Sequence, residues 1–197
     1  MNCLDKITIT EDYIKLNEHG DGSAIMHIAE KKISDNMGDL VSKNGGDILE
    51  IGFGMHISAD AIQKNKNISS HTIIEIHRIL YKKALEWAKD KKNTNIIYGD
   101  WINVLPKINK KFDGILHDSY DDYNISEFLN GCKHLCKKGT IVVFYYYEGN
   151  EQNIFNKFKC SLSDNEVLDL PYKQSFDFKN WELYYTFFNG ENFVKDL

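Results

Sequence analysis

Acidic side chains stand at or beside the ends of four apolar runs in this 197-residue chain, and they are Glu50, Glu75, Asp100 and Asp118. The carboxyl ends of parallel strands meet at one edge of a sheet, where open α/β folds bind small molecules. Carboxylates gathered at such an edge can accept hydrogen bonds from ribose hydroxyls or grip a cationic group. The spacing therefore predicts an anionic binding site for a small molecule.

A glycine pair, Gly52 and Gly54 in ILEIGFGMH, directly follows the first apolar run. Glycines there allow a tight strand-to-helix turn whose backbone approaches a ligand closely. A dinucleotide fingerprint has a third glycine three residues after the second, but this chain has Ile57. With Glu75 placed to accept both ribose hydroxyls, the pattern favours a nucleoside site without phosphates. A turn that serves only chain reversal remains the alternative.

The elements that would position these residues alternate as in a parallel sheet covered by helices. Helical periodicity runs through residues 78–92 and through 125–139, where Gly139 acts as a stop signal. A late strand in residues 180–188 is expected to be antiparallel. The other predicted strands cover residues 47–54, 71–77, 95–100, 112–118 and 139–147.

The sequence predicts an α/β fold, a doubly wound and mostly parallel sheet in one compact unit over residues 47–197. Residues 1–46 form a separate N-terminal extension, with a helical pattern over residues 24–42, that can fold over the strand ends. We expect this extension to act as a lid over the site.

Composition and charge narrow the class of protein. The formal net charge of −5 argues against nucleic acid as a partner. Charges near the start exclude a secretory signal and no apolar run reaches membrane-spanning length, so we expect a cytoplasmic protein without a membrane anchor. Cys132, His134 and Cys136 suggest a metal site only weakly. We expect buried thiols and no metal, because a second ligand pair at suitable spacing is missing.

Four motifs in this order and spacing carry a family resemblance: ILEIGFGM, HTIIEIH, YGDW and FDGILHDSY. They resemble the class I S-adenosylmethionine-dependent methyltransferases. More narrowly they resemble the guanidinoacetate N-methyltransferase family and its relative, the fungal protein arginine δ-N-methyltransferase, over about residues 22–148. The resemblance implies a seven-stranded Rossmann-like sheet and S-adenosylmethionine as cofactor.

The same resemblance assigns cofactor-binding residues. It implies that Glu75 holds the ribose and that Asp100 with Trp101 borders the adenine, although core packing is the other interpretation of Trp101. The residues implied to contact the rest of the cofactor are Met26, Glu50 and the backbone from Gly52 through Asp60, which includes Gly54 and Met55.

Two carboxylates match the family's substrate-binding positions, Asp118 and Glu30. A planar guanidinium can be gripped by one carboxylate while a second takes its remaining edge. The nucleophilic nitrogen must lose its proton, which costs roughly 7 to 9 kcal/mol at pH 7 for a group with a pKa above about 12. We expect Asp118 to accept that proton and Glu30 to balance the charge. His77 and His117 lie near the same edge but are far weaker acceptors.

The loop after the fifth strand departs from the family. Glu148, after Tyr147, stands where the family has a small hydroxyl residue, and it would repel a substrate carboxylate. Tyr13 is the candidate for the family's aromatic lid. The sequence thus predicts a methyltransferase, monomeric or homodimeric, for a small guanidine such as guanidinoacetate, arginine, agmatine or a biosynthetic intermediate. Alternatives are peptidyl arginine or another small molecule as acceptor, a dinucleotide-dependent oxidoreductase, and a catalytically idle partner subunit.

Overall fold

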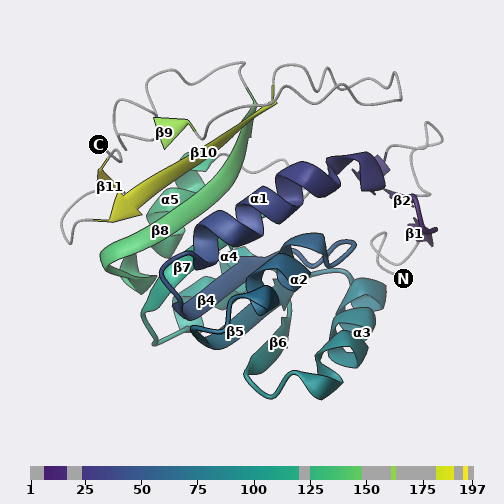
Figure 1. Cartoon of the computed structure of the whole chain (residues 1–197), viewed down its shortest axis with the longest axis horizontal. Coiled ribbons are helices and arrows are strands. Elements are labelled where there is room, and N and C mark those ends of the chain that lie inside the picture. The colour runs from purple at the N-terminus through teal and green to yellow at the C-terminus, as the bar shows by residue number, and fades with distance from the viewer. Residues whose placement is uncertain are drawn as a thin grey trace.

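Five parallel strands form the centre of the protein in the computed structural model, which describes residues 7–16, 24–119, 125–147, 161–162, 181–188 and 193–194. Their order across the sheet is β6-β5-β4-β7-β8, so the chain starts in the middle and winds outward in both directions (Figure 1). This confirms the doubly wound α/β prediction. The strands are β4 (Gly46–Ile51), β5 (Ile68–Glu75), β6 (Thr94–Tyr98), β7 (Phe112–His117) and β8 (Cys136–Tyr147).

An antiparallel strand extends the sheet beyond β8, as predicted for the end of the chain. Strand β10 (Trp181–Phe188) pairs with β8 along its whole length. Two-residue strands, β9 (Ser161–Leu162) and β11 (Phe193–Val194), pair in turn with β10. The sheet of the described residues therefore has eight strands, and the expected count of seven is not what they show.

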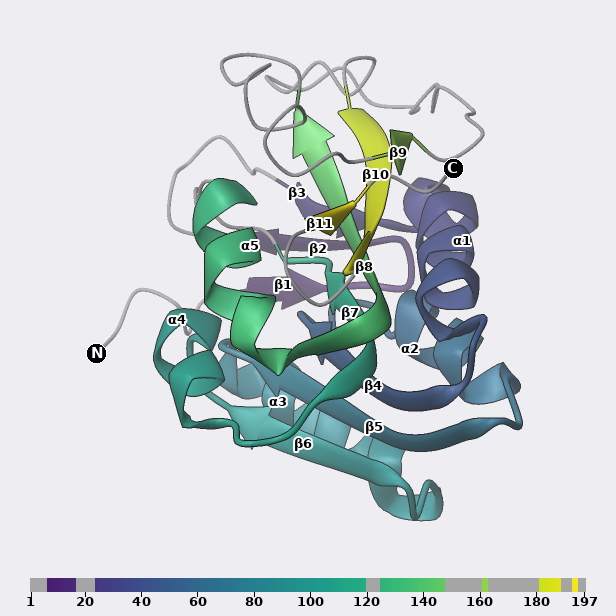
Figure 2. The same cartoon turned by 90° about the vertical axis from the view of Figure 1, so that its left-hand side faces the viewer.

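Helices cover both faces of the sheet, as Figure 2 shows edge-on. Helices α1 (Lys31–Ser42), α2 (Ile57–Lys64) and α3 (Arg78–Trp87) pack on one face, through two clusters of buried apolar side chains. Helices α4 (Trp101–Val104) and α5 (Ile125–Cys132) pack on the other. Short 3-10 turns adjoin these helices: η2 (Ile28–Glu30), η3 (Ala88–Asp90), η4 (Leu105–Lys107) and η5 (Lys133–Leu135). Among the described residues, no helix is long and apolar enough to cross a membrane.

Burial follows the apolar pattern of the sequence with small shifts. The last four residues of β4 are all buried, as expected for a central strand covered on both faces. On α3 the buried stripe is narrower than predicted, because Leu80 and Ala84 are buried while Ile79 is 37% exposed. Helix α5 ends before the predicted stop at Gly139, which instead lies inside β8 with φ of +88°.

The N-terminal segment is only partly helical, which corrects the helix predicted over residues 24–42. It opens with an antiparallel sheet of β1 (Ile7–Ile9), β2 (Tyr13–Leu16) and β3 (Ala24–His27). The cause is pairing of the first four predicted helical residues with β2. The chain turns to helix only where extended His27 caps η2. A cluster around Ile14, Met26, Ile57 and Leu80 joins this sheet to the starts of α2 and α3.

The ends of β4 and β7 lie side by side where the winding direction reverses. Ile51 pairs with His117, and the Asp118 N–H donates to the Ile51 carbonyl oxygen at 2.9 Å. The chain after β4 continues into α2 on one face, while the chain after β7 leads to α5 on the other. Such a switch point is where doubly wound folds bind ligands.

Gly52 fills this crowded point with φ of +91°, and a Cβ there would lie 2.0 Å from the Asp118 carbonyl oxygen. We predict that Gly52→Ala abolishes stable folding or lowers the free energy of unfolding by several kcal/mol. Gly139→Ala is the matched control, because its φ of +88° is similar and nothing lies within 4 Å of its Cβ. That control has only backbone strain, about 1 to 2 kcal/mol. Urea unfolding measures both, and equal losses would contradict the steric account.

Candidate functional site

The glycine turn connects β4 to α2 along an unusual backbone path. Gly52, Gly54 and His56 all have positive φ, at 91°, 47° and 55°. The Gly52 N–H donates to the Ile74 carbonyl oxygen at 2.9 Å, which ties the turn to β5. A turn of this shape presents backbone at the carboxyl edge of the sheet, as the sequence predicted.

Glu75 ends β5 and locks this turn in place. Its two carboxylate oxygens accept from the N–H groups of Phe53, at 2.9 Å, and His77, at 2.6 Å. Only 4% of Glu75 is exposed. Burial raises the pKa of this carboxyl above its ordinary value, and the backbone donors act in the opposite direction. The predicted ribose acceptor therefore also organises the turn.

Met26 brings the N-terminal sheet onto the turn. Its sulfur accepts from the Met55 N–H at 3.2 Å, and a Cβ on Gly54 would lie 2.7 Å from that sulfur. Both methionines belong to, or pack against, the cluster that joins this sheet to α2. Two residues implied by the resemblance, 29 positions apart, are thus in direct contact.

Glu50 lies beneath the turn, not at its surface. Its side chain has no exposed area, and its oxygens pair with Ser58, at 2.5 Å, and with the imidazole of His71, at 2.8 Å. Both oxygens of Glu50 are thus engaged inside the protein, and its expected contact with the cofactor stays a prediction. Sequence inspection missed Ser58 and His71, although a histidine within the apolar strand ISSHTIIE was the available signal.

Asp118 and Glu30 come together although 88 positions separate them. Asp118 follows β7 directly, and its Oδ2 lies 3.4 Å from the Ser58 hydroxyl. Glu30, half-buried at the end of η2, accepts from the His27 N–H at 2.7 Å. Burial first, and then the negative charges of Glu50 and Glu30, raise the pKa of Asp118 to about 7. The two predicted substrate carboxylates therefore act on each other electrostatically.

The connection after β6 holds the residues predicted to border an adenine. Asp100 caps α4 by accepting from the Ile102 N–H at 3.0 Å. Trp101 is 5% exposed and packs edge-on against His117 and Phe128. Its ring therefore packs in the core, as the alternative interpretation expected, whereas Asp100 is partly exposed.

Other candidate residues lie at the margins of the site. His77 caps α3 and is buried, while His117 lies 3.2 Å from the Ser119 hydroxyl. Tyr13 begins β2. Tyr147 ends β8, and Glu148 lies outside the described residues.

The cysteines predicted as buried thiols are confirmed as such. Cys132 and Cys136 are free and buried, whereas His134 bonds to the carbonyl oxygens of Gly131 and Leu105. Within the described ranges no three metal-binding side chains gather.

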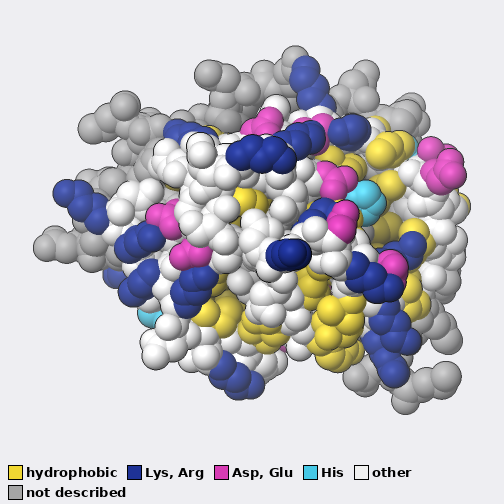
Figure 3. Space-filling view, turned by 60° about the horizontal axis from the view of Figure 1, so that its bottom comes forward, with side chains coloured by type: hydrophobic (Ala, Val, Ile, Leu, Met, Phe, Trp, Pro, Cys, Tyr) yellow, Lys and Arg dark blue, Asp and Glu magenta, His cyan; other side chains and the backbone are white. Residues whose placement is uncertain are grey.

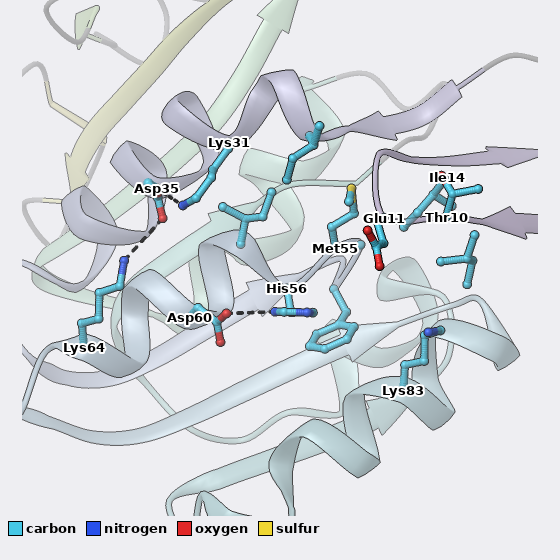
Figure 4. Close-up of a pocket in the computed structure, with 15 residues that line it drawn as sticks. Thr10, Glu11, Ile14, Lys31, Asp35, Met55, His56, Asp60, Lys64 and Lys83 are labelled. Atoms are coloured by element: carbon cyan, nitrogen blue, oxygen red, sulfur yellow. Dashed lines mark hydrogen bonds and ion pairs between the residues drawn. The ribbon is translucent and has the colours of Figure 1, made fainter.

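A cavity of about 540 Å³ lies between the N-terminal sheet, α1, the glycine turn and α3 (Figure 4). Its apolar walls include Ile14, Phe53 and Met55, and Lys83 projects from α3 at its margin. The space-filling view shows basic and acidic side chains intermixed on one face of the molecule (Figure 3). Sequence inspection did not foresee this cavity, because its wall from β1 and β2 was not predicted.

The sequence matches one protein family and is similar to curated members of the arginine methyltransferases. A model of the family described as guanidinoacetate N-methyltransferase matches residues 10–136, more than half of the chain. Protein arginine N-methyltransferase 2 of Yarrowia lipolytica is 29% identical over 142 residues, covering 66% of this chain and 29% of that protein. The chain thus spans less than a third of the length of this curated relative.

Solved structures share the fold at low sequence identity. The N-methyltransferase NodS from Bradyrhizobium japonicum WM9 aligns with a TM-score of 0.60 and 16% identity, over 83% of this chain and 97% of that one. Fibrillarin from Aeropyrum pernix, solved with natively bound S-adenosyl-L-methionine, aligns with a TM-score of 0.57 and 14% identity, over 91% and 97%. The chain therefore has the Rossmann-like methyltransferase fold.

The raised pKa of Asp118 predicts that this residue makes the stability of the protein depend on pH. Between pH 4 and 7 the folded protein holds a proton on Asp118 that the unfolded chain has released, so stability from this group is lost as pH rises towards 7. We predict that Asp118→Asn is progressively more stable than the native protein from pH 4 to 7, with a constant difference above about pH 7. Urea unfolding across this range measures it.

Asp47→Asn provides a control of opposite sign. Burial alone would raise the pKa of Asp47, but hydrogen bonds from Ser70 and Lys110 outweigh it and hold the pKa below its ordinary value. That variant should lose stability at neutral pH. If the stability difference between Asp118→Asn and the native protein does not change with pH, the pKa of Asp118 is not raised by burial and the neighbouring charges.

Proposed function

The chain belongs to the guanidinoacetate N-methyltransferase family, and on that premise we propose that it transfers a methyl group from S-adenosylmethionine to a guanidino nitrogen. This family consists of S-adenosylmethionine-dependent methyltransferases, and the chain has their fold. The observation that carries the proposal is the convergence of Asp118 and Glu30 beside the glycine turn.

The glycine turn has the features that this cofactor requires. Gly52 and Gly54 leave the backbone without side chains where it approaches a ligand, and a Cβ on either would collide with Asp118 or Met26. Glu75 is held by backbone N–H groups, those of Phe53 and His77 on its two oxygens, with Gly54 and Ile76 adding to them, and in this proposal its carboxylate also accepts the ribose hydroxyls. When bound, the cofactor supplies an electrophilic methyl group on a sulfonium.

Neighbouring residues complete the proposed cofactor site. Met26 and Met55 provide thioether and apolar surface at the turn. Asp100 and Trp101 border the adenine through their backbone, since the indole ring lies in the core. Glu50 supports the site from beneath.

Asp118 and Glu30 together suit a planar cation. A guanidinium offers several N–H donors in one plane, so two carboxylates can engage different edges of it. Burial, and then repulsion from Glu50 and Glu30, raise the pKa of Asp118 to about 7 in the free protein. An entering guanidinium removes that repulsion and favours the ionised form of Asp118.

Asp118 is then the proton acceptor for methyl transfer. A guanidinium releases its proton with a pKa above about 12, so a base must take the proton as the nitrogen attacks. Asp118 is a carboxylate once the guanidinium has entered, and its place beside the glycine turn puts it within reach of that proton as the N–C bond forms. Glu30 retains its negative charge and stabilises the cationic product.

The acceptor is a small guanidine in this proposal, such as guanidinoacetate, arginine or agmatine. Peptidyl arginine is the second candidate, and the name of the Yarrowia relative favours it. Tyr147 and Glu148 remain predictions from the sequence. If Glu148 faces the acceptor, guanidines without a carboxylate tail should be preferred.

The direct test is transfer of an isotopically labelled methyl group from S-adenosylmethionine to a panel of free guanidines and an arginine-containing peptide. We predict that at least one guanidine is labelled, and that Asp118→Asn lowers turnover by at least about 100-fold while S-adenosylhomocysteine binds as before. The reason is that the amide keeps the shape of the side chain and cannot accept the proton.

Glu75→Gln should distinguish cofactor binding from proton acceptance, because Glu75 belongs to the proposed cofactor site and Asp118 to the proposed substrate site. This variant should weaken S-adenosylhomocysteine binding, because charge-assisted bonds to the ribose and to the turn are lost. Full turnover in Asp118→Asn would exclude Asp118 as the base. Labelling of no guanidine despite tight cofactor binding would exclude the proposed acceptor class.

A further inference from the structure

A chain of buried polar side chains runs from Asp118 into the interior. Ser58, from α2, has its hydroxyl oxygen 3.4 Å from Asp118 Oδ2 and 2.5 Å from Glu50 Oε1. His71, from β5, has Nε2 2.8 Å from the other oxygen of Glu50. Glu50 and His71 have no exposed area, and Ser58 is 2% exposed. Strands β4 and β5, helix α2 and the residue after β7 thus supply one connected series of polar side chains.

The Ser58 hydroxyl has a single hydrogen and two carboxylates within reach. When it donates to Glu50, only lone pairs of Ser58 face Asp118, and Asp118 gains a hydrogen bond there only if it is itself protonated. When Asp118 is ionised, the same hydrogen can turn towards it, and Glu50 then relies on His71. The orientation of the Ser58 hydroxyl is therefore linked to the proton on Asp118.

His71 gives Glu50 a hydrogen-bond partner inside the protein. The Gln63 amide nitrogen lies 3.2 Å from His71 Nδ1 and 3.1 Å from the Thr94 hydroxyl oxygen. With the amide donating to Nδ1, the imidazole hydrogen sits on Nε2 and is donated to Glu50. The second oxygen of Glu50 thus has a hydrogen-bond donor inside the protein, out of contact with solvent.

We propose that Ser58, Glu50 and His71 are positioning residues that decide whether Asp118 carries a proton. Glu50 places a buried acidic side chain next to Ser58, His71 lies against its other oxygen, and Ser58 can turn its one hydroxyl hydrogen towards Glu50 or towards Asp118. The use of this arrangement in methyl transfer rests on the proposed function. The protonation of Asp118 is a property of the free protein and does not.

Two other titratable groups lie near Asp118, and they are Glu30 and His117. Glu30 faces it from η2 and adds a second negative charge. His117, the preceding residue, turns its ring against Phe128, at 4.4 Å between ring centroids. Glu30 is half-buried at the start of α1, whereas Glu50 is fully buried, so the charge of Glu50 is screened less by solvent.

The test follows the titration of the Asp118 carboxyl carbon by NMR in the free protein, assigned by its loss in Asp118→Asn. The native midpoint should lie near pH 7. Glu50→Gln should lower it by about one unit or more, because a like charge is removed. Ser58→Ala should raise it by roughly half a unit, because ionised Asp118 loses a donor. Ser58→Thr, which retains a hydroxyl, should restore the native midpoint.

Ser34→Ala is the matched control. Ser34 is also a buried helical serine, at 1% exposed, but it lies in α1 and outside the series of side chains that leads to Asp118. Its midpoint should equal the native one. An unchanged midpoint in Ser58→Ala overturns the proposal, even if Glu50→Gln fails to fold. The titration uses the protein without cofactor or acceptor, so its result does not depend on whether the protein transfers a methyl group. If the protein transfers methyl groups but the Asp118 midpoint does not change in Ser58→Ala, only the present inference is rejected and the proposed function stands.

Discussion

The close approach of the β4 and β7 ends is the constraint on which the site depends. The Asp118 carbonyl oxygen occupies the space where any other residue at 52 would place its Cβ. This contact puts the glycine turn and the acid of the next strand at one point, where the winding of the sheet reverses. Glu75 then fixes the turn from β5, and Met26 covers it from the N-terminal sheet. A cofactor site and a substrate carboxylate become neighbours through backbone packing alone.

The same packing crowds negative charge. Glu30, Glu50 and Asp118 share a region with little solvent, and the free protein responds by keeping Asp118 protonated up to about pH 7. Such a site is unfavourable while empty and favourable around a cation. Catalytic sites often concentrate shifted pKa values for this reason. Here the charge that opposes folding at high pH is the charge that would select a guanidinium and accept its proton.

Much of this arrangement was accessible from the sequence. The end of an apolar run marks the end of a strand, so the sequence alone could assign Glu75 and Asp118 to the same edge of the sheet. The N-terminal strands could not be predicted in this way. A run of four residues has no periodicity that separates a strand from a helix, and β3 is a strand because it pairs with β2. Ser58 and His71 were missed because their importance depends on a distance across elements. Trp101 had two interpretations in the sequence, and its ring packs in the core, where a large aromatic side chain is well buried.

The central claim is that a guanidinium displaces the proton of Asp118. Calorimetric titration of the methyl-accepting guanidine, with S-adenosylhomocysteine present, in buffers of different ionisation enthalpy measures the protons released on binding. At pH 6 the account predicts release of close to one proton per guanidine bound, falling towards zero by pH 9, with the release lost in Asp118→Asn. Tight binding at pH 6 without proton release would contradict it.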